Sequence, residues 1–239
     1  SVLIGVNDVW HELTVQNGVA AEKFEKIYDM LITEDKEALP DIKIILLEPF
    51  VTEGTGTSMY YEEFREEVKK RGEAAKRIAQ KHGLVFVPLQ DKFDEAVVDS
   101  EPEYWTTDGV HPAAAGHQLI KEALAEAEAN RKICENIPIK AYFPTEDELN
   151  GMSFRSKIDF EGEVRIVDIE GVDRCACCAP HFSSTAPIGI IKIVDAISWK
   201  GGMRLTVLCG LAAYADLLRA TGQNGDSYRA AAEAMAAKW

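Results

Sequence analysis

The chain has 239 residues, of which 46% are hydrophobic and 28% are charged. This is the composition of an ordinary globular protein, with room for one large domain or two small ones. The formal net charge of −14 argues against broad electrostatic attraction to DNA. No apolar run approaches the ~20 residues that cross a bilayer, so no membrane-spanning helix is expected.

The five cysteines predict a reducing, cytoplasmic location. All of them lie after residue 133, and three fall within residues 175–178. An odd number with clustered thiols is not the pattern of a secreted disulfide framework, and metal or redox chemistry is an option at the cluster. Cys134 and Cys209 stand apart from the cluster and are interpreted as core residues.

Strands and helices alternate in the first half of the chain. Short apolar runs at 2–6, 43–49 and 84–89 are typical of buried parallel strands. Helical spacing is found at 20–38, with Phe24, Ile27, Met30 and Leu31 on one face, at about 60–82, closed by Gly83, at about 91–98, and from Pro112 past Leu124. This alternation indicates parallel βαβ units in a layered α/β sheet.

The second half of the chain has an α+β pattern that predicts a small antiparallel domain. Its strand-like segments are 137–143, 163–171, 188–198 and 203–210, and "WKGG" between the last two predicts a hairpin. The join between the halves lies within 121–138, which is predicted to be one continuous helix without a flexible linker. Residues 212–239 are predicted to form a helical tail.

Two motifs in the first half belong together chemically. "GVND" (5–8) follows the first predicted strand, and "DGVHP" (108–112) precedes the last helix. Sites of open α/β sheets form at the carboxyl ends of strands, where the Asn7 amide can donate to an oxyanion. Asp108 can orient the His111 imidazole, which then acts as a general base toward a serine. The alternative is a capped turn with a surface histidine.

The two motifs resemble sequence blocks of the SGNH (GDSL-type) hydrolase family, over about residues 1–124. Gly5 and Asn7 match its G-x-N-D block, and Asp108 and His111 match the acid and base of its catalytic triad. The resemblance implies a flavodoxin-like three-layer fold with a parallel sheet. It also implies hydrolysis of a small ester, thioester or carbohydrate ester, with no cofactor.

A serine nucleophile for His111 is not found in this half. The family's G-D-S block precedes its G-x-N-D block by some tens of residues, and the chain opens on Ser1 inside a predicted strand, so we expect further sequence upstream. The only G-D-S in the chain ends at Ser227, which does not follow a buried strand and is a weak candidate.

A sheet without its first strands exposes an edge and apolar helix faces. The isolated chain is therefore expected to be marginally stable and to self-associate through this edge. A sharp, cooperative melt of a monomer would contradict that expectation.

The densest region of the second half is "DRCACCAPHF" (173–182), where Cys177 stands four residues before His181. In a helix or turn such residues face the same way, and a thiolate with an imidazole makes half of a tetrahedral zinc site. Cys175 and Cys178 are further sulfur candidates, although the adjacent Cys177 and Cys178 do not easily reach one metal. The alternative is a buried, mildly hydrophobic cysteine cluster.

This region resembles the editing domain of alanyl-tRNA synthetase and its free-standing AlaX-type relatives, over about residues 127–211. The resemblance implies that Cys177 and His181 are zinc ligands, that tRNA(Ala) is a partner, and that seryl- or glycyl-tRNA(Ala) is hydrolysed. The family's second pair of ligands, an upstream H-x₃-H, is absent from this chain, so zinc is expected at a partial site with low occupancy. The stretches that match are "ANRKICENIPIKAYFPTEDEL" (129–149), "VRIVDIEGVDRCACCAPH" (164–181) and "KGGMRLTVLCG" (200–210).

Three interpretations of the joined halves remain. In the first, the chain is a chimera in which neither site is complete and catalysis is impaired. In the second, it is an SGNH enzyme portion followed by an editing portion. In the third, it is a module that binds tRNA or a partner without catalysis. The first is favoured for the biochemistry and the second for classification. A zinc-dependent deacylase of mischarged tRNA(Ala) is the alternative enzyme. Arg204, beside Gly201 and Gly202, is a weak candidate for a phosphate contact, with a nearby carboxylate as its other partner.

Overall fold

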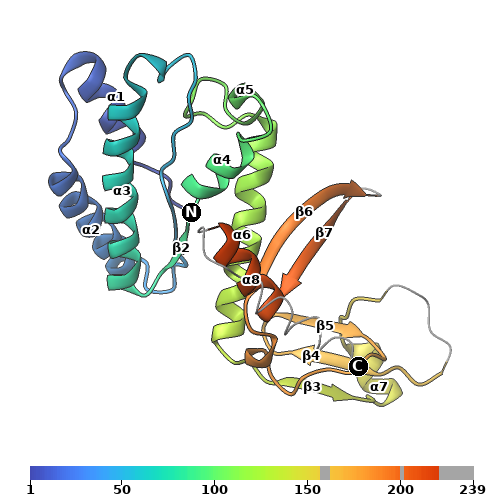
Figure 1. The fold of residues 1–239 in the computed structure, drawn as a ribbon. Coiled ribbons are helices and arrows are strands. Elements are labelled where there is room, and N and C mark those ends of the chain that lie inside the picture. The colour runs from blue at the N-terminus through green and yellow to red at the C-terminus, as the bar shows by residue number, and fades with distance from the viewer. Residues whose placement is uncertain (157–161, 200–201, 221–239) are drawn as a thin grey trace. The chain divides into compact units, whose positions relative to one another are not determined.

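The computed structural model describes residues 1–156, 162–199 and 202–220 (Figure 1). The chain divides into two units, residues 1–127 and 128–239. The boundary falls inside helix α6 (Ala114–Cys134), within the segment where the join was expected. The fold is a mixed α/β fold, as predicted, with parallel strands in the first unit and antiparallel strands in the second.

A short parallel sheet organises the first unit. Strand β1 (Ile45–Leu47) pairs with β2 (Val85–Val87) in parallel register. On the other side of β1 the chain pairs only at Val2, whose N–H donates to the Ile45 carbonyl at 2.8 Å and whose carbonyl accepts from Leu47 at 2.9 Å. The predicted strand at 2–6 is thus reduced to a single bridge. Gly5, at φ +119°, ends the extended segment, and α1 (Val6–Val15) begins directly after it.

Helices cover both faces of this sheet, which gives the predicted three layers (Figure 1). Successive strand residues point to opposite faces. Leu46 packs in a core with residues of α2 and α3, whereas Leu47 packs in a second core with residues of α4 and α6. The helices of the first unit, besides α1 and α6, are α2 (Ala21–Ala38), η1 (Ser58–Tyr60), α3 (Tyr61–His82), α4 (Gln90–Ala96) and α5 (Pro102–Trp105).

The apolar face predicted for α2 is only partly correct. Phe24 is buried, but the other buried residues of α2 are Tyr28 and Ile32, which follow it at spacings of four. The other three residues predicted to lie on this face are exposed: Ile27 at 50%, Met30 at 51% and Leu31 at 41%. The stripe at 24, 28 and 32 faces the sheet, so the apolar residues beside it lie on the flank of the helix. Self-association through such exposed apolar surface stays a prediction.

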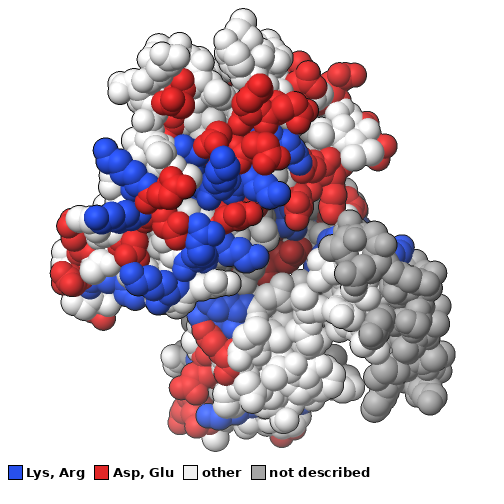
Figure 2. Space-filling model, turned by 60° about the vertical axis from the view of Figure 1, so that its left-hand side comes forward, with Lys and Arg blue, Asp and Glu red and all other residues white. Residues whose placement is uncertain are grey.

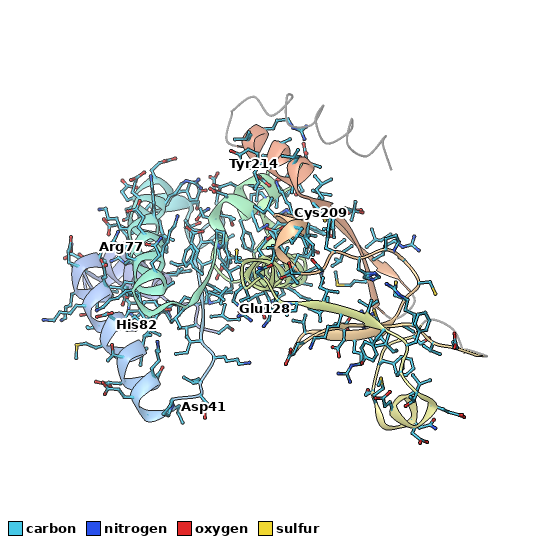
Figure 3. All side chains as sticks on the ribbon, turned by 90° about the horizontal axis from the view of Figure 1, so that it is seen from below. Asp41, Arg77, His82, Glu128, Cys209 and Tyr214 are labelled. Atoms are coloured by element: carbon cyan, nitrogen blue, oxygen red, sulfur yellow. The ribbon has the colours of Figure 1, made fainter. Side chains whose placement is uncertain are left out.

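Ion pairs join α2 to α3 on the surface of the first unit (Figure 3). Arg77 bonds Glu25 at 2.7 Å, and Asp29 accepts from Lys81 at 2.7 Å and contacts His82 at 2.8 Å. Acidic and basic side chains are interspersed over the face seen in Figure 2. His82 therefore has a structural partner in Asp29. Pairs this exposed contribute only about 0–1 kcal/mol each.

The second unit contains a three-stranded antiparallel sheet and a separate hairpin. The sheet order is β3-β4-β5, from β3 (Ile139–Tyr142), β4 (Ile166–Ile169) and β5 (Asp173–Ala176), and the hairpin pairs β6 (Ile191–Trp199) with β7 (Gly202–Cys209). The predicted hairpin and antiparallel pattern are confirmed. The helices are α7 (Glu146–Gly151), η2 (Ala186–Ile188) and α8 (Leu211–Ala220).

Three features of this unit differ from the sequence predictions or were missed by them. Strand β5 lies within the cysteine-rich segment, whose polar and thiol side chains gave no apolar run. Helix α7 was also missed, although Thr145 and Glu148 form a capping box at its start, a signal that the sequence contains. Cys134 and Cys209 are exposed rather than core residues, since each stands at the last position of its element.

No helix in the described part of the chain combines the length and the apolar character needed to cross a membrane.

Candidate active site

The turn around Gly109 holds Asp108 and His111 in direct contact. Asp108 Oδ1 accepts the backbone N–H of Val110 at 3.1 Å and that of His111 at 2.9 Å. Asp108 Oδ2 lies 2.7 Å from His111 Nδ1. When Nδ1 carries the proton and donates it to the carboxylate, Nε2 is the basic nitrogen, which is the tautomer that a general base needs. The arrangement is the one expected for an acid–base pair.

The electrostatics of the turn favour an ionised Asp108. Burial acts to raise the pKa of this carboxyl, but hydrogen bonds from the His111 backbone, the His111 ring and Val110 outweigh it and hold the pKa below its ordinary value. A carboxyl with a lowered folded pKa stabilises the fold above its unfolded pKa. That contribution is lost as the pH falls through the lowered value. At neutral pH the carboxylate is therefore charged and able to stabilise an imidazolium.

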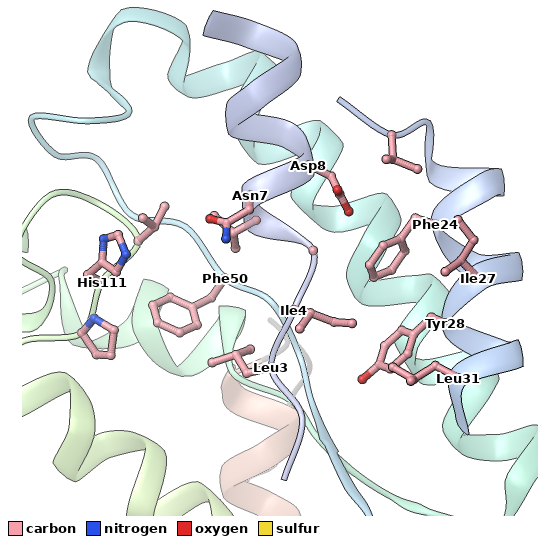
Figure 4. Close-up of a pocket in the computed structure, with 15 residues that line it drawn as sticks. Leu3, Ile4, Asn7, Asp8, Phe24, Ile27, Tyr28, Leu31, Phe50 and His111 are labelled. Atoms are coloured by element: carbon pink, nitrogen blue, oxygen red, sulfur yellow. The ribbon is translucent and has the colours of Figure 1, made fainter. Parts of the chain in front are cut away.

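Asn7 and Gly5 lie beside this turn, at the start of α1 rather than at the end of a strand. Asn7 and His111 line the same cavity, of about 550 Å³ (Figure 4). A Cβ on Gly5 would be in tight contact, 3.2 Å from Arg71 Cβ and 3.3 Å from Phe24 Cζ, and the φ of +119° disfavours any L side chain there. The structure thus brings together the two motifs that were paired from the sequence.

The remainder of the cavity wall is largely apolar. Figure 4 shows Asn7, Phe50 and His111 on one side and residues of α2 on the other. No serine is among the described residues that line it. Such a cavity, apolar with a few polar groups at one end, is typical of a site for a small organic ligand. Its lining is Leu3, Ile4, Gly5, Val6, Asn7, Asp8, Val19, Phe24, Ile27, Tyr28, Leu31, Phe50, Val110, His111 and Pro112.

Sequence reasoning missed three aromatic residues at the site, Trp10 beside His111 and Phe50 and Tyr28 in the cavity wall. The Trp10 ring lies 6.4 Å from the His111 ring, centroid to centroid, and Phe50 forms part of the cavity wall. Tyr28 is 2% exposed, and its hydroxyl has no hydrogen-bond partner among the described residues. Burial raises the pKa of Tyr28 to about 12, so the hydroxyl is neutral. Only Trp10 had a signal in the sequence, since it lies two residues after the predicted site motif at 5–8.

The cysteine segment is a strand followed by a loop and not a helix. Cys175 belongs to β5 and Cys177 follows it, and both are half-buried, whereas Cys178 and His181 are exposed. Arg165 fixes the start of the loop, with its guanidinium donating to the carbonyls of Cys177 at 2.9 Å and Ala179 at 3.0 Å. The helical spacing argument for Cys177 and His181 therefore does not apply here.

The described residues do not provide a complete metal site. Among them, no three His, Cys, Asp or Glu side chains gather closely enough to hold a metal ion. Cys177 and His181 alone leave at least two positions of a tetrahedral zinc ion without protein ligands. Arg204 lies exposed on β7, and Ser227 lies outside the described residues.

Comparison with protein families divides the chain in the same way. Residues 1–119 match the GDSL-like Lipase/Acylhydrolase family. Residues 164–205 match the Threonyl and Alanyl tRNA synthetase second additional domain. The second match is shorter than the predicted 127–211 and includes Cys177, His181 and Arg204.

Curated relatives agree with these matches. An acetylxylan esterase from Geobacillus stearothermophilus is 31% identical over 128 residues, 52% of this chain and 55% of the relative. An alanyl-tRNA editing protein from Xenopus laevis is 39% identical over 72 residues, 29% of this chain and 18% of the relative. A GDSL-like lipase from Parabacteroides merdae is 35% identical, with a TM-score of 0.49, covering 52% of this chain and 57% of the other. The chain thus spans about half the length of the esterase.

Proposed function

Because the chain joins a GDSL-like lipase/acylhydrolase segment to an alanyl-tRNA editing segment, we propose that its first unit is the acid–base portion of an ester hydrolase. The observation that supports this most is the 2.7 Å contact between Asp108 and His111 beside a cavity that Asn7 also lines. The substrate proposed for this portion is a small ester.

In the proposed reaction, His111 Nε2 takes a proton from the nucleophile that attacks the ester. Asp108 stabilises the imidazolium that forms. The Asn7 amide donates to the oxyanion that develops on the ester carbonyl. No serine lines the cavity among the described residues. We therefore propose that the 239-residue chain is catalytically impaired and that water, activated by His111, is its slow nucleophile.

Hydrolysis of p-nitrophenyl acetate tests this proposal. His111→Ala and Asp108→Asn are each expected to lower the turnover of the full chain at least tenfold, because general-base catalysis contributes about 10²–10⁴-fold when fully developed. The rate is measured as p-nitrophenolate release, with urea unfolding curves to confirm that each variant is folded.

His117→Ala is the matched control for this assay. His117 is exposed and lies six residues after His111, on α6, but outside the cavity lining. Its loss should leave the rate unchanged. Equal losses in His111→Ala and His117→Ala would show non-specific imidazole catalysis and contradict the proposal.

For the second unit we propose a tRNA-binding module derived from an editing domain, with tRNA(Ala) as the partner and no completed metal site. The match over residues 164–205 supports this function. The relative named an alanyl-tRNA editing protein is covered over only 18% of its length, so the deacylase activity is the alternative proposal. Gel shifts with tRNA(Ala), together with turnover of seryl-tRNA(Ala), separate binding from deacylation.

Zinc binding is the sharper test of this unit. After chelation and refilling with zinc, metal analysis should find less than one zinc per chain, since Cys177 and His181 supply only half a ligand set. Cys177→Ala should abolish this binding, and Cys134→Ala, which removes an exposed cysteine outside the cluster, should not. Tight binding of one zinc per chain would mean that further ligands exist.

A further inference from the structure

Two segments that lie about fifty residues apart in the sequence interlock behind the Asp108–His111 turn. They are the loop at 51–58 and the turn at 106–112. The N–H of Thr52 donates to the Gly109 carbonyl at 2.8 Å, and the N–H of Gly56 donates to the Asp108 carbonyl at 2.9 Å. The two backbone carbonyls that follow the Asp108 side chain, those of Asp108 and Gly109, are therefore tied to the loop.

Three buried threonines connect these segments from the inside. Thr52, Thr57 and Thr106 are each 1% exposed. The Thr57 hydroxyl donates to the Thr52 carbonyl at 2.8 Å, and the hydroxyls of Thr52 and Thr106 are 2.7 Å apart. A buried hydroxyl without a partner is destabilising, so each of these hydroxyls is held in the orientation that makes its bond.

The packing leaves no space for this arrangement to shift. A Cβ on Gly109 would lie 2.4 Å from the Thr57 hydroxyl and 2.8 Å from the Thr52 carbonyl oxygen. A Cβ on Gly54 would lie 2.5 Å from the Asp108 carbonyl carbon. The loop and the turn are thus in direct backbone contact, with Thr57 filling the space beneath Gly109.

The loop is itself anchored to the body of the first unit. The Gln90 side chain accepts from the Val51 N–H at 3.0 Å and donates to the Val51 carbonyl at 2.9 Å. Gln90 also donates to Asp94, which Arg65 contacts from α3. Residues of α3 and α4 therefore hold Val51 in place, and Val51 leads directly into the loop that carries Thr52 and Thr57.

We propose that Thr57 is a positioning residue for the Asp108–His111 pair, and that it acts with Thr52 and Thr106 by fixing the backbone of the turn. The effect of this positioning on catalysis rests on the proposed hydrolase function of the first unit. Thr57 touches neither Asp108 nor His111 by its hydroxyl, so it acts through the Thr52 carbonyl and through its contact with Gly109.

Thr57→Val tests the proposal, because valine keeps the shape and removes the hydroxyl. In NMR titrations of the full chain, the carboxyl pKa of Asp108 should rise toward its ordinary value as the hydrogen bonds from His111 and Val110 weaken. The signal of the hydrogen-bonded His111 Nδ1 proton should broaden or disappear. The His111-dependent part of p-nitrophenyl acetate turnover should fall about tenfold in kcat with KM little changed, and Thr57→Ser should restore all three.

Thr33→Val is the matched control, because the Thr33 hydroxyl also donates to a backbone carbonyl at 2.8 Å, that of Asp29, but on α2. If Thr57→Val and Thr33→Val lose similar stability while the Asp108 and His111 signals stay unchanged in both, Thr57 is only structural and the proposal is wrong. Should Thr57→Val fail to fold, Thr106→Val removes the bond to the Thr52 hydroxyl and a longer one to the Pro102 carbonyl at 3.5 Å, and it decides by the same signals.

The NMR signals separate this proposal from the hydrolase proposal. Altered Asp108 and His111 signals in a chain without esterase activity would support positioning and overturn the function. Activity that depends on His111 but is insensitive to Thr57→Val would support the hydrolase function and overturn the positioning role of Thr57.

Discussion

Gly109→Ala is expected to lower the free energy of unfolding by about 2–6 kcal/mol. The residue has φ +105°, which an L-amino acid adopts at a cost of roughly 1–3 kcal/mol. Its Cβ would also lie 2.4 Å from the Thr57 hydroxyl and 2.8 Å from the Thr52 carbonyl oxygen, and such overpacking adds about 1–3 kcal/mol. Urea unfolding followed by tryptophan fluorescence measures the loss.

Gly83→Ala separates the two causes. Gly83 also has a positive φ, of +65°, at the end of α3, but a Cβ there would meet no atom within 4 Å. This variant should lose only about 1–2 kcal/mol, the cost of a left-handed conformation. Equal losses in the two variants would mean that the close contact between the turn and the loop is absent in solution.

Phe93→Ala is expected to destabilise the chain by about 3–5 kcal/mol, the usual loss for a fully buried aromatic residue. Phe93 is 0% exposed and stacks on Phe50 with ring centroids 3.8 Å apart and planes 6° from parallel. Its core also contains Leu47 and Ala123, so the cavity left by alanine touches both the sheet and α6. Because Phe50 lines the candidate active site, the loss of packing should extend to the cavity wall that Phe50 forms.

Tyr104→Ala provides the comparison for Phe93→Ala, measured in the same urea titrations. Tyr104 is 63% exposed and contacts Trp105 edge to face, so its removal should change stability by less than about 0.5 kcal/mol. A loss below about 1 kcal/mol in Phe93→Ala would contradict the stacked core beneath the site.

Local patterns in the sequence predicted the elements and the acid–base pair. Helices at 61–82 and 114–134 and the hairpin ending at Cys209 follow from spacing and turn residues, which act over a few positions. The contact between Asp108 and His111 was predictable for the same reason, since three residues around a glycine close within one turn. The missed helix α7 also had its signal in a local capping box.

Other features were decided only by the tertiary structure, because they depend on contacts between segments that are distant in the sequence. Periodicity alone placed Ile27 on the apolar face of α2, but packing against the sheet buries Tyr28 instead. The bonds between the loop at 51–58 and the turn at 106–112 join residues about fifty positions apart, and no local pattern specifies them.

The sequence by itself thus determined two hydrolase-like segments, their order and the residues that define them. The tertiary structure decided that Asn7 and His111 share one cavity and that hydrogen bonds of buried threonines join the loop to the turn. It also decided that Cys177 and His181 lie on a strand end and loop, where the described residues supply no third ligand. The physical reason is that spacing acts along the chain, whereas a site is made by the packing of segments that the chain keeps far apart.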